Sequence, residues 1–159
     1  MPTQKITTFL WYDGNAEEAA TLYTSLFENS GIIEVVRYGE GGPGPKGSVM
    51  TVKFALGGVE FVALNGGPMF KFTEAISLFV SCQSQKEVDD LWSKLSAGGE
   101  EGPCGWLKDR FGLSWQIIPK ALPRLIGDPD PGRSQRVVAA MLQMKKLDIA
   151  RLEAAARGE

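Results

Sequence analysis

An internal duplication constrains this chain more than any other feature, because residues 6–26 and 75–95 follow the same plan. Each stretch opens with an apolar run of β-branched and aromatic residues, typical of a strand, and continues into a segment with one apolar stripe at helical spacing. Corresponding stripe residues are 69 positions apart, and so are the two expected helix caps, Asn15 and Ser84. The stripes are Ala19, Leu22, Tyr23 and Leu26 in the first copy and Val88, Leu91, Trp92 and Leu95 in the second.

The order of the later segments repeats as well. Each expected helix is followed by three strand-like runs, at residues 32–38, 48–56 and 59–64 in the first copy and 100–103, 105–110 and 113–118 in the second. The sequence therefore predicts an α+β fold of two βαβββ repeats, at residues 5–67 and 74–119, within one domain of residues 1–127.

The remaining residues, 128–159, are expected to form a helical C-terminal tail. Asp130 and Pro131 suit the N-cap and the first position of a helix. Apolar residues continue at helical spacing after them, at Val137, Met141, Met144, Leu147, Ile149 and Leu152. This stripe must be covered, so we expect a homodimer in which the tail of each chain packs on the other chain.

Composition excludes several classes of function. A net charge of −2 gives no basic footprint for nucleic acid, and no apolar run approaches the ~18 residues of a membrane span. The absence of histidine excludes Ser-His-Asp and Cys-His catalysis and removes the commonest metal ligand. Two cysteines in a chain of 159 residues suggest reduced thiols and a cytoplasmic location. Neither a nucleic-acid nor a membrane partner is expected.

A glycine-rich segment at residues 39–47 matches G-x-G-x-x-G through Gly39, Gly41 and Gly44. The dinucleotide fingerprint needs those glycines to open a helix whose N-terminus holds a pyrophosphate. Pro43 and Pro45 interrupt this match, and a strand-like run follows it. We therefore expect a mobile loop and no cofactor.

Several phrases of the sequence together resemble one protein family. They are FLWYDGNAEEAATLY, FVALNGGP, EAISLFVSC, GGEEGPCGWLKDRFGLSWQIIP and the tail DPDP…RVVAAMLQMKKLDI. They look like the PhnB-like branch of the vicinal oxygen chelate superfamily, which includes glyoxalase I, extradiol dioxygenases and bleomycin-resistance proteins. Members of that branch often carry the label demethylubiquinone methyltransferase. The resemblance implies that the strands of each repeat curl into a glyoxalase-like half-barrel cup with the site inside it.

The resemblance also implies where the superfamily places metal ligands, on the first and last strands of each repeat. Those positions fall near Thr8 and Ser77 on the first strands and near Val62 and Gln116 on the last. None of the four is an ionisable ligand that would neutralise a divalent cation. We therefore expect a cup without a metal ion.

Five further candidates follow from the residues themselves. Period-two alternation places Cys104, Trp106 and Lys108 on one face, where Lys108 would lower the pKa of the thiol or clamp a carboxylate or phosphonate. The alternative is a buried thiol beside a core tryptophan, with Lys108 at the solvated rim. Phe70 and Phe72 are also expected to share a face, either lining an aromatic pocket or packing the floor of the cup.

These observations favour a protein that binds a small organic molecule in its cup. One alternative is an enzyme of the superfamily acting on a small substrate, and the sequence leaves catalysis open. Another is a structural or partner-binding dimer whose cup is filled by its own side chains.

Overall fold

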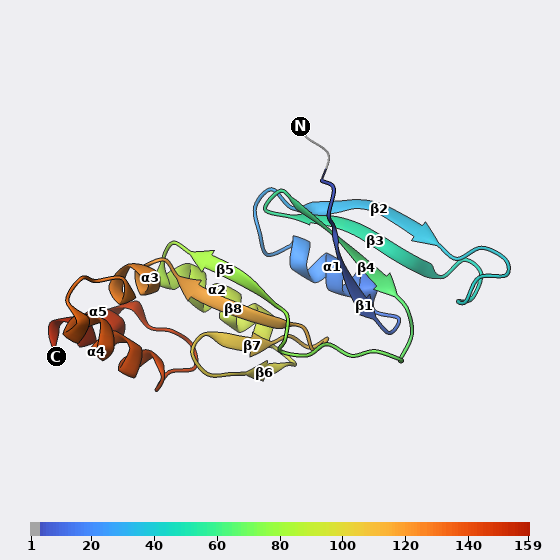
Figure 1. Cartoon of the computed structure of the whole chain (residues 1–159). Coiled ribbons are helices and arrows are strands. Elements are labelled where there is room, and N and C mark those ends of the chain that lie inside the picture. The colour runs from blue at the N-terminus through green and yellow to red at the C-terminus, as the bar shows by residue number, and fades with distance from the viewer. Residues whose placement is uncertain (1–3) are drawn as a thin grey trace. The chain divides into compact units, whose positions relative to one another are not determined.

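A computed structural model describes residues 4–159 and divides the chain into two compact units, one ending at Lys71 and the other spanning Phe72–Glu159 (Figure 1). The first unit contains β1 (Thr8–Tyr12), α1 (Ala16–Thr24), β2 (Gly31–Arg37), β3 (Val49–Leu56) and β4 (Val59–Asn65). The second contains β5 (Ser77–Cys82), α2 (Gln85–Ser96), β6 (Glu100–Glu101), β7 (Trp106–Lys108) and β8 (Ser114–Pro119), followed by α3 (Ala121–Ile126), α4 (Pro131–Met141) and α5 (Ile149–Arg157).

Strand order confirms the predicted duplication. The first sheet runs β1-β4-β3-β2 and the second runs β5-β8-β7-β6, so each repeat brings its first strand beside its last. In both sheets that pair is parallel, and the other neighbours are antiparallel. The helix connects the first strand to the second in each repeat, which is the expected βαβββ order.

In the second unit, α2 covers one face of the sheet, with contacts to β5, β7 and β8. All four predicted stripe residues of this helix are buried, and the strands supply Leu107, Trp115 and Ile117 to the same core. Ser84 caps the helix as predicted, because its hydroxyl accepts from Glu87 N at 3.2 Å. The Glu87 carboxylate reaches back to Gln83 N at 2.7 Å.

In the first unit, α1 follows its prediction less closely. Ala19 and Tyr23 are buried, whereas Leu22 and Leu26 are half-buried and Leu26 lies beyond the end of the helix. Asn15 occupies the N-cap position, but its side chain forms no capping hydrogen bond. Asn65 Oδ1, at the end of β4, accepts from Ala16 N at 2.9 Å instead. A residue distant in sequence thus satisfies the first free N–H of the helix.

The constant offset of 69 holds for the helices but not for the strands. Tyr12 and Cys82 end β1 and β5 and are both buried, and they are 70 positions apart. The connection between strand and helix is therefore one residue longer in the first repeat. A shift of one residue moves a side chain to the other face of a sheet.

The tail helices belong to the second unit and cluster beyond the ends of β5 and β8 (Figure 1). Val137, Met144 and Leu152 are buried in one cluster with Ile118 and Leu122 of the same chain. The predicted stripe is therefore real, but the reason for placing it on a second chain is wrong, because this chain already covers it. The stripe is also divided between two helices, and Asp130 and Asp148 cap α4 and α5.

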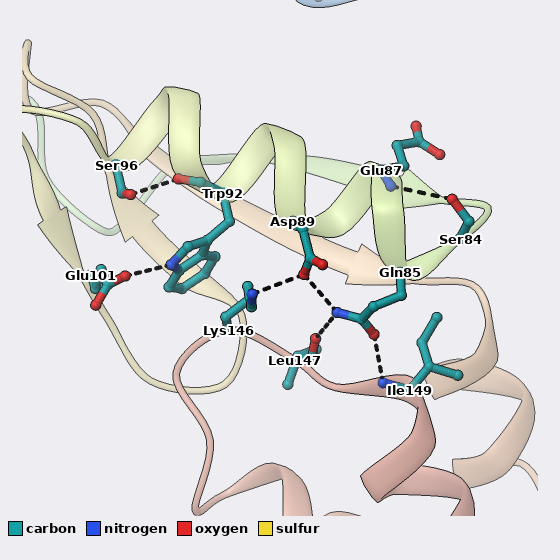
Figure 2. A network of polar contacts seen from close by, with 10 residues as sticks. All are labelled: Ser84, Gln85, Glu87, Asp89, Trp92, Ser96, Glu101, Lys146, Leu147 and Ile149. Carbon is teal, nitrogen blue, oxygen red and sulfur yellow. Dashed lines mark hydrogen bonds and ion pairs between the residues drawn. The ribbon is translucent and has the colours of Figure 1, made fainter.

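Gln85 of α2 forms hydrogen bonds with the segment between α4 and α5 and with the start of α5 (Figure 2). Gln85 Nε2 donates to Leu147 O at 2.9 Å, and Gln85 Oε1 accepts from Ile149 N at 2.8 Å. An ion pair between Lys146 Nζ and Asp89 Oδ1, 2.9 Å apart, lies beside it. Because a single side chain serves two backbone groups, the tail is held in a fixed register on α2. Among residues 4–159, no helix has the length and apolarity that a membrane crossing requires.

Candidate functional site

The candidate site lies on the face of the second sheet opposite α2. Trp106 in β7 stands opposite Gln116 in β8, and Gln116 is in register with Phe79 in β5. Two residues along each strand, a second row is formed by Lys108 of β7, Ser114 of β8 and Ser77 of β5. Neighbouring Leu107 and Trp115 point the other way, into the core. Four of the predicted residues, Ser77, Trp106, Lys108 and Gln116, are thus brought together on one face.

A groove of about 460 Å³ follows the β6–β7 side of this face. Its size falls in the range of pockets that hold small molecules. The lining consists of Glu74, residues 100–103, residues 106–108 and Ser114. The groove therefore combines an indole, one ammonium, one hydroxyl and the carboxylates of Glu74 and Glu100, whereas the Glu101 carboxylate is turned to α2.

An ion pair between Lys108 and Glu74 lies in the groove. The hydrogen bond from Lys108 lowers the pKa of the Glu74 carboxyl below its usual range. The same contact, helped by the charge of Glu100, raises the pKa of the Lys108 ammonium. Both groups are therefore ionised at neutral pH, and neither is tuned for proton transfer there.

Ser114 is the unusual member of the groove. Its side chain is 1% exposed, and Oγ has no hydrogen-bond partner among the described residues. A buried hydroxyl without a partner costs free energy, whereas the large majority of buried polar side chains are paired. The groove lining thus contains a buried hydroxyl whose hydrogen-bonding capacity the described residues leave unused.

The residues that the resemblance assigns to metal ligation do not fit a divalent cation. Gln116 Nε2 donates to Ser77 Oγ at 2.9 Å, so these two form a neutral polar pair. Val62 has no donor atom in its side chain. Thr8 lies on the same face of β1 as Leu10 and Tyr12, and that face is turned to α1. Its predicted equivalence to Ser77 is therefore wrong by one residue. Within residues 4–159, no group of three or more Cys, Asp or Glu side chains is placed to hold a metal ion.

The two cysteines lie away from the groove. Cys104 sits in the turn before β7 at φ 58°, and its N donates to Met144 O in the tail at 2.8 Å. It therefore does not continue the alternation of Trp106 and Lys108, and the expected face of three residues is reduced to two. Burial, with the charge of Glu87, raises the pKa of the Cys82 thiol to about 12, which makes it a poor nucleophile at neutral pH.

The two phenylalanine candidates also lie outside the groove. The ring of Phe70 contacts that of Trp11 edge-on, with centroids 4.9 Å apart, in the first unit. Phe72 begins the second unit and is half-buried. Residues 66–76 contain no strand, so the shared face predicted for Phe70 and Phe72 has no backbone to maintain it.

The glycine-rich loop forms a separate feature of the first unit. It joins β2 to β3, two antiparallel strands, and no helix follows it. Gly44 lies directly against the ring of Tyr38, whose hydroxyl donates to Asn65 O at 2.6 Å. The loop thus folds back over a tyrosine and does not form the glycine turn before a helix that binds nucleotide phosphates.

Comparison with known proteins agrees with this architecture. A family model described as 3-demethylubiquinone-9 3-methyltransferase matches residues 4–118. The chain belongs to this family. This family is the PhnB-like branch of the vicinal oxygen chelate superfamily. Among curated proteins, none matches the chain.

Solved structures of relatives support the family assignment. A putative 3-demethylubiquinone-9 3-methyltransferase, PhnB protein, from Bacillus cereus is 41% identical, with a TM-score of 0.66, over 73% of this chain and 99% of that one. A Pseudomonas aeruginosa protein is 20% identical, with a TM-score of 0.61, over 74% of this chain and 98% of that one. The fosfomycin resistance protein FosX from Listeria monocytogenes is 18% identical, with a TM-score of 0.50, over 75% and 94% of the two chains. The last two likenesses establish the fold alone.

Several members of the groove lining, Glu74, Glu100 and Ser114 among them, were not predicted from the sequence. Ser114 is two residues before Gln116 in β8, so the alternation that was applied to β7 also places it on this face. Glu74 gives no signal in the sequence, because its partner, Lys108, is distant in the chain. Only the pairing of β5, β7 and β8 brings the two side chains together.

Proposed function

We propose that this chain binds a small organic molecule, without a metal ion, in the groove of the second unit. The observation that carries this proposal is the buried, unpartnered hydroxyl of Ser114 in the groove lining. A ligand atom that hydrogen-bonds this hydroxyl would remove the cost of leaving it unpaired. The groove's volume of about 460 Å³ also argues against a site filled by the protein's own side chains.

The groove favours binding over turnover of a substrate. Its cation is paired with Glu74, and the pKa directions keep both groups charged. The cysteine nearest in sequence, Cys104, belongs to the neighbouring turn. The second candidate is an enzyme of the superfamily that acts on a small substrate. In such an enzyme Lys108 and Glu74 would polarise the substrate with their charges and would not exchange protons with it.

Methyl transfer, which the family's description names, receives no support from the sheet topology. A nucleotide-bearing methyl donor suits a crevice at the carboxyl ends of parallel strands beside a glycine-rich turn and a helix N-terminus. Here both sheets are largely antiparallel, and the glycine-rich loop connects two antiparallel strands. The groove residues therefore do not fit such a donor, and we assign no step to it.

The variant Ser114→Ala distinguishes an effect on ligand affinity from an effect on stability. We expect the free energy of unfolding to stay within about 0.5 kcal/mol of the wild type or to rise, because the change removes an unsatisfied hydroxyl. We expect the tightest of three probes, benzylamine, benzyl alcohol and phenylacetate, to bind about 2–10-fold more weakly, which is the value of one hydrogen bond. Isothermal titration calorimetry measures the affinity, and urea unfolding measures the stability.

The matched control is Ser93→Ala, an exposed serine on α2 outside the groove, which should change neither quantity. Phe70→Ala tests the first unit in the same way, because its exposed ring lies outside the groove. Failure of all three probes to bind the wild-type chain would overturn the proposal. If Phe70→Ala weakened binding of the probe and Ser114→Ala did not, the binding site would lie in the first unit.

We further propose a cytoplasmic homodimer. Free Cys82 and Cys104 are consistent with a reducing compartment. The tail does not require a second chain, but Phe9 and Phe79 are 60% and 56% exposed, and large exposed apolar side chains mark interaction surfaces. Light scattering at high micromolar concentration is expected to give the mass of two chains, and a stable monomer would exclude the dimer.

A further inference from the structure

We infer that the ligand of this groove is an organic cation, a small amine or ammonium compound. The inference rests on the proposed function and adds the chemical class of the ligand. The charged side chains on the groove face are Glu74, Glu100 and Lys108, two carboxylates against one ammonium, because Glu101 is turned to α2. A groove with an excess of negative charge concentrates cations and repels anions.

The single cation of the lining is already compensated. Lys108 forms its ion pair with Glu74, and it stands directly opposite Glu100 in the β6–β7 pair. Residues directly opposite each other project from the same face of a sheet. An anionic ligand would have to displace Glu74 while facing Glu100, so Lys108 is a poor anchor for it.

The remaining carboxylate on this face, that of Glu100, is better placed to receive a cation. The neighbouring Glu101 stands opposite Leu107, and its Oε1 accepts from Trp92 Nε1 at 2.6 Å, so its carboxylate lies on the α2 side of the sheet (Figure 2). Glu100 is exposed and stands across from Lys108, whose charge it shares with Glu74. The acidic side of the groove therefore retains charge that its own lysine does not neutralise.

Trp106 supplies the second element of recognition. Its side chain lines the groove and is half-buried. An indole attracts a cation over its face, and tryptophan does so more strongly than tyrosine or phenylalanine. The apolar surface of the same ring can accommodate the hydrocarbon part of an amine.

Ser114 completes the site without determining the sign of the charge. Its hydroxyl oxygen can accept from an ammonium N–H, and its O–H can donate to an anion. The buried hydroxyl therefore indicates a polar ligand, and the carboxylates select the cationic one. An organic cation is preferred to a metal ion because these side chains do not converge as metal ligands within residues 4–159.

Calorimetric titration of the full chain with the three probes tests the inference, because they share one ring and differ in charge. Benzylamine is expected to bind more tightly than benzyl alcohol, and benzyl alcohol more tightly than phenylacetate. A cation–π contact predicts a preference of about 2–30-fold for the amine over the alcohol. Added salt should weaken binding of the amine and leave that of the alcohol unchanged.

Two variants should move the affinity for benzylamine in opposite directions. Glu100→Gln removes an attractive charge and should weaken binding, whereas Lys108→Met removes a repulsive one and frees Glu74, so it should strengthen binding. Lys94→Met, an exposed lysine in the last turn of α2, is the matched control and should leave the affinity unchanged.

Tighter binding of phenylacetate, abolished by Lys108→Met, would overturn the cation inference and leave the proposed function standing. Equal binding of all three probes would also overturn it, because the groove would then recognise the ring alone. If none of the probes binds, the proposed function itself fails. The outcomes of the two proposals are therefore distinguishable.

Discussion

Replacing Asp109 by alanine is expected to lower the free energy of unfolding by about 2–5 kcal/mol, because the change leaves buried N–H groups without partners. Asp109 is 2% exposed and lies in the turn between β7 and β8. Its Oδ1 accepts from Phe111 N at 2.9 Å and from Leu113 N at 3.1 Å, and its Oδ2 accepts from Trp115 Nε1 at 2.9 Å. One carboxylate thus fixes both the turn and the largest core side chain.

Urea unfolding followed by circular dichroism measures this loss. Asp90→Ala is the control, because Asp90 is half-exposed and its ion pair with Lys86 is of a kind worth about 0.3–0.5 kcal/mol. The stability of Asp109→Asn should fall between those of Asp109→Ala and Asp90→Ala. The amide keeps one acceptor oxygen, but its N–H groups face the donors that the second carboxylate oxygen accepted from. A stability of Asp109→Ala equal to that of Asp90→Ala would show that the turn does not depend on the carboxylate.

The second large effect is expected in the tail. Leu152 in α5 is fully buried in the cluster that joins the tail helices to Ile118 and Leu122. Leu152→Ala should lower the free energy of unfolding by about 2–5 kcal/mol through lost burial and the cavity that remains. Leu142→Ala, at a residue 58% exposed between α4 and α5, should cost much less.

This comparison decides whether the tail is an integral part of the second unit. Hydrogen exchange should show that Leu152→Ala weakens protection in β8 as well as in α5, because both contribute to one core. Loss of protection confined to the tail helices would contradict the packing described. The same core implies that deleting residues 130–159 exposes apolar surface on α3 and β8 and causes aggregation.

Local patterns predicted most of the fold because they act over a few residues. The S-x-x-E box at Ser84, the Asp130-Pro131 start of α4 and the α2 stripe depend on neighbours in the chain. The tail's placement depends on long-range contacts, among them those of Gln85 with Leu147 and Ile149, and no pattern in the sequence indicates them. The cap of α1 was misassigned for the same reason, because its acceptor comes from β4.

The site was predicted in part. Alternation correctly placed Trp106 and Lys108 on one face, since β7 is a regular strand. It failed at Cys104, where a left-handed backbone conformation ends the alternation. Thr8 was misplaced because the repeats differ by one residue between strand and helix, a difference that a comparison of helices alone cannot detect.

The most direct test of the groove as a ligand site is a two-dimensional nitrogen–proton NMR titration of the full chain with benzylamine. The account predicts chemical-shift changes at the Trp106 indole and at the backbone amides of Lys108 and Ser114. The Trp11 indole, in the first unit, should be unaffected. Shifts confined to the first unit, or their absence at millimolar benzylamine, would contradict the account.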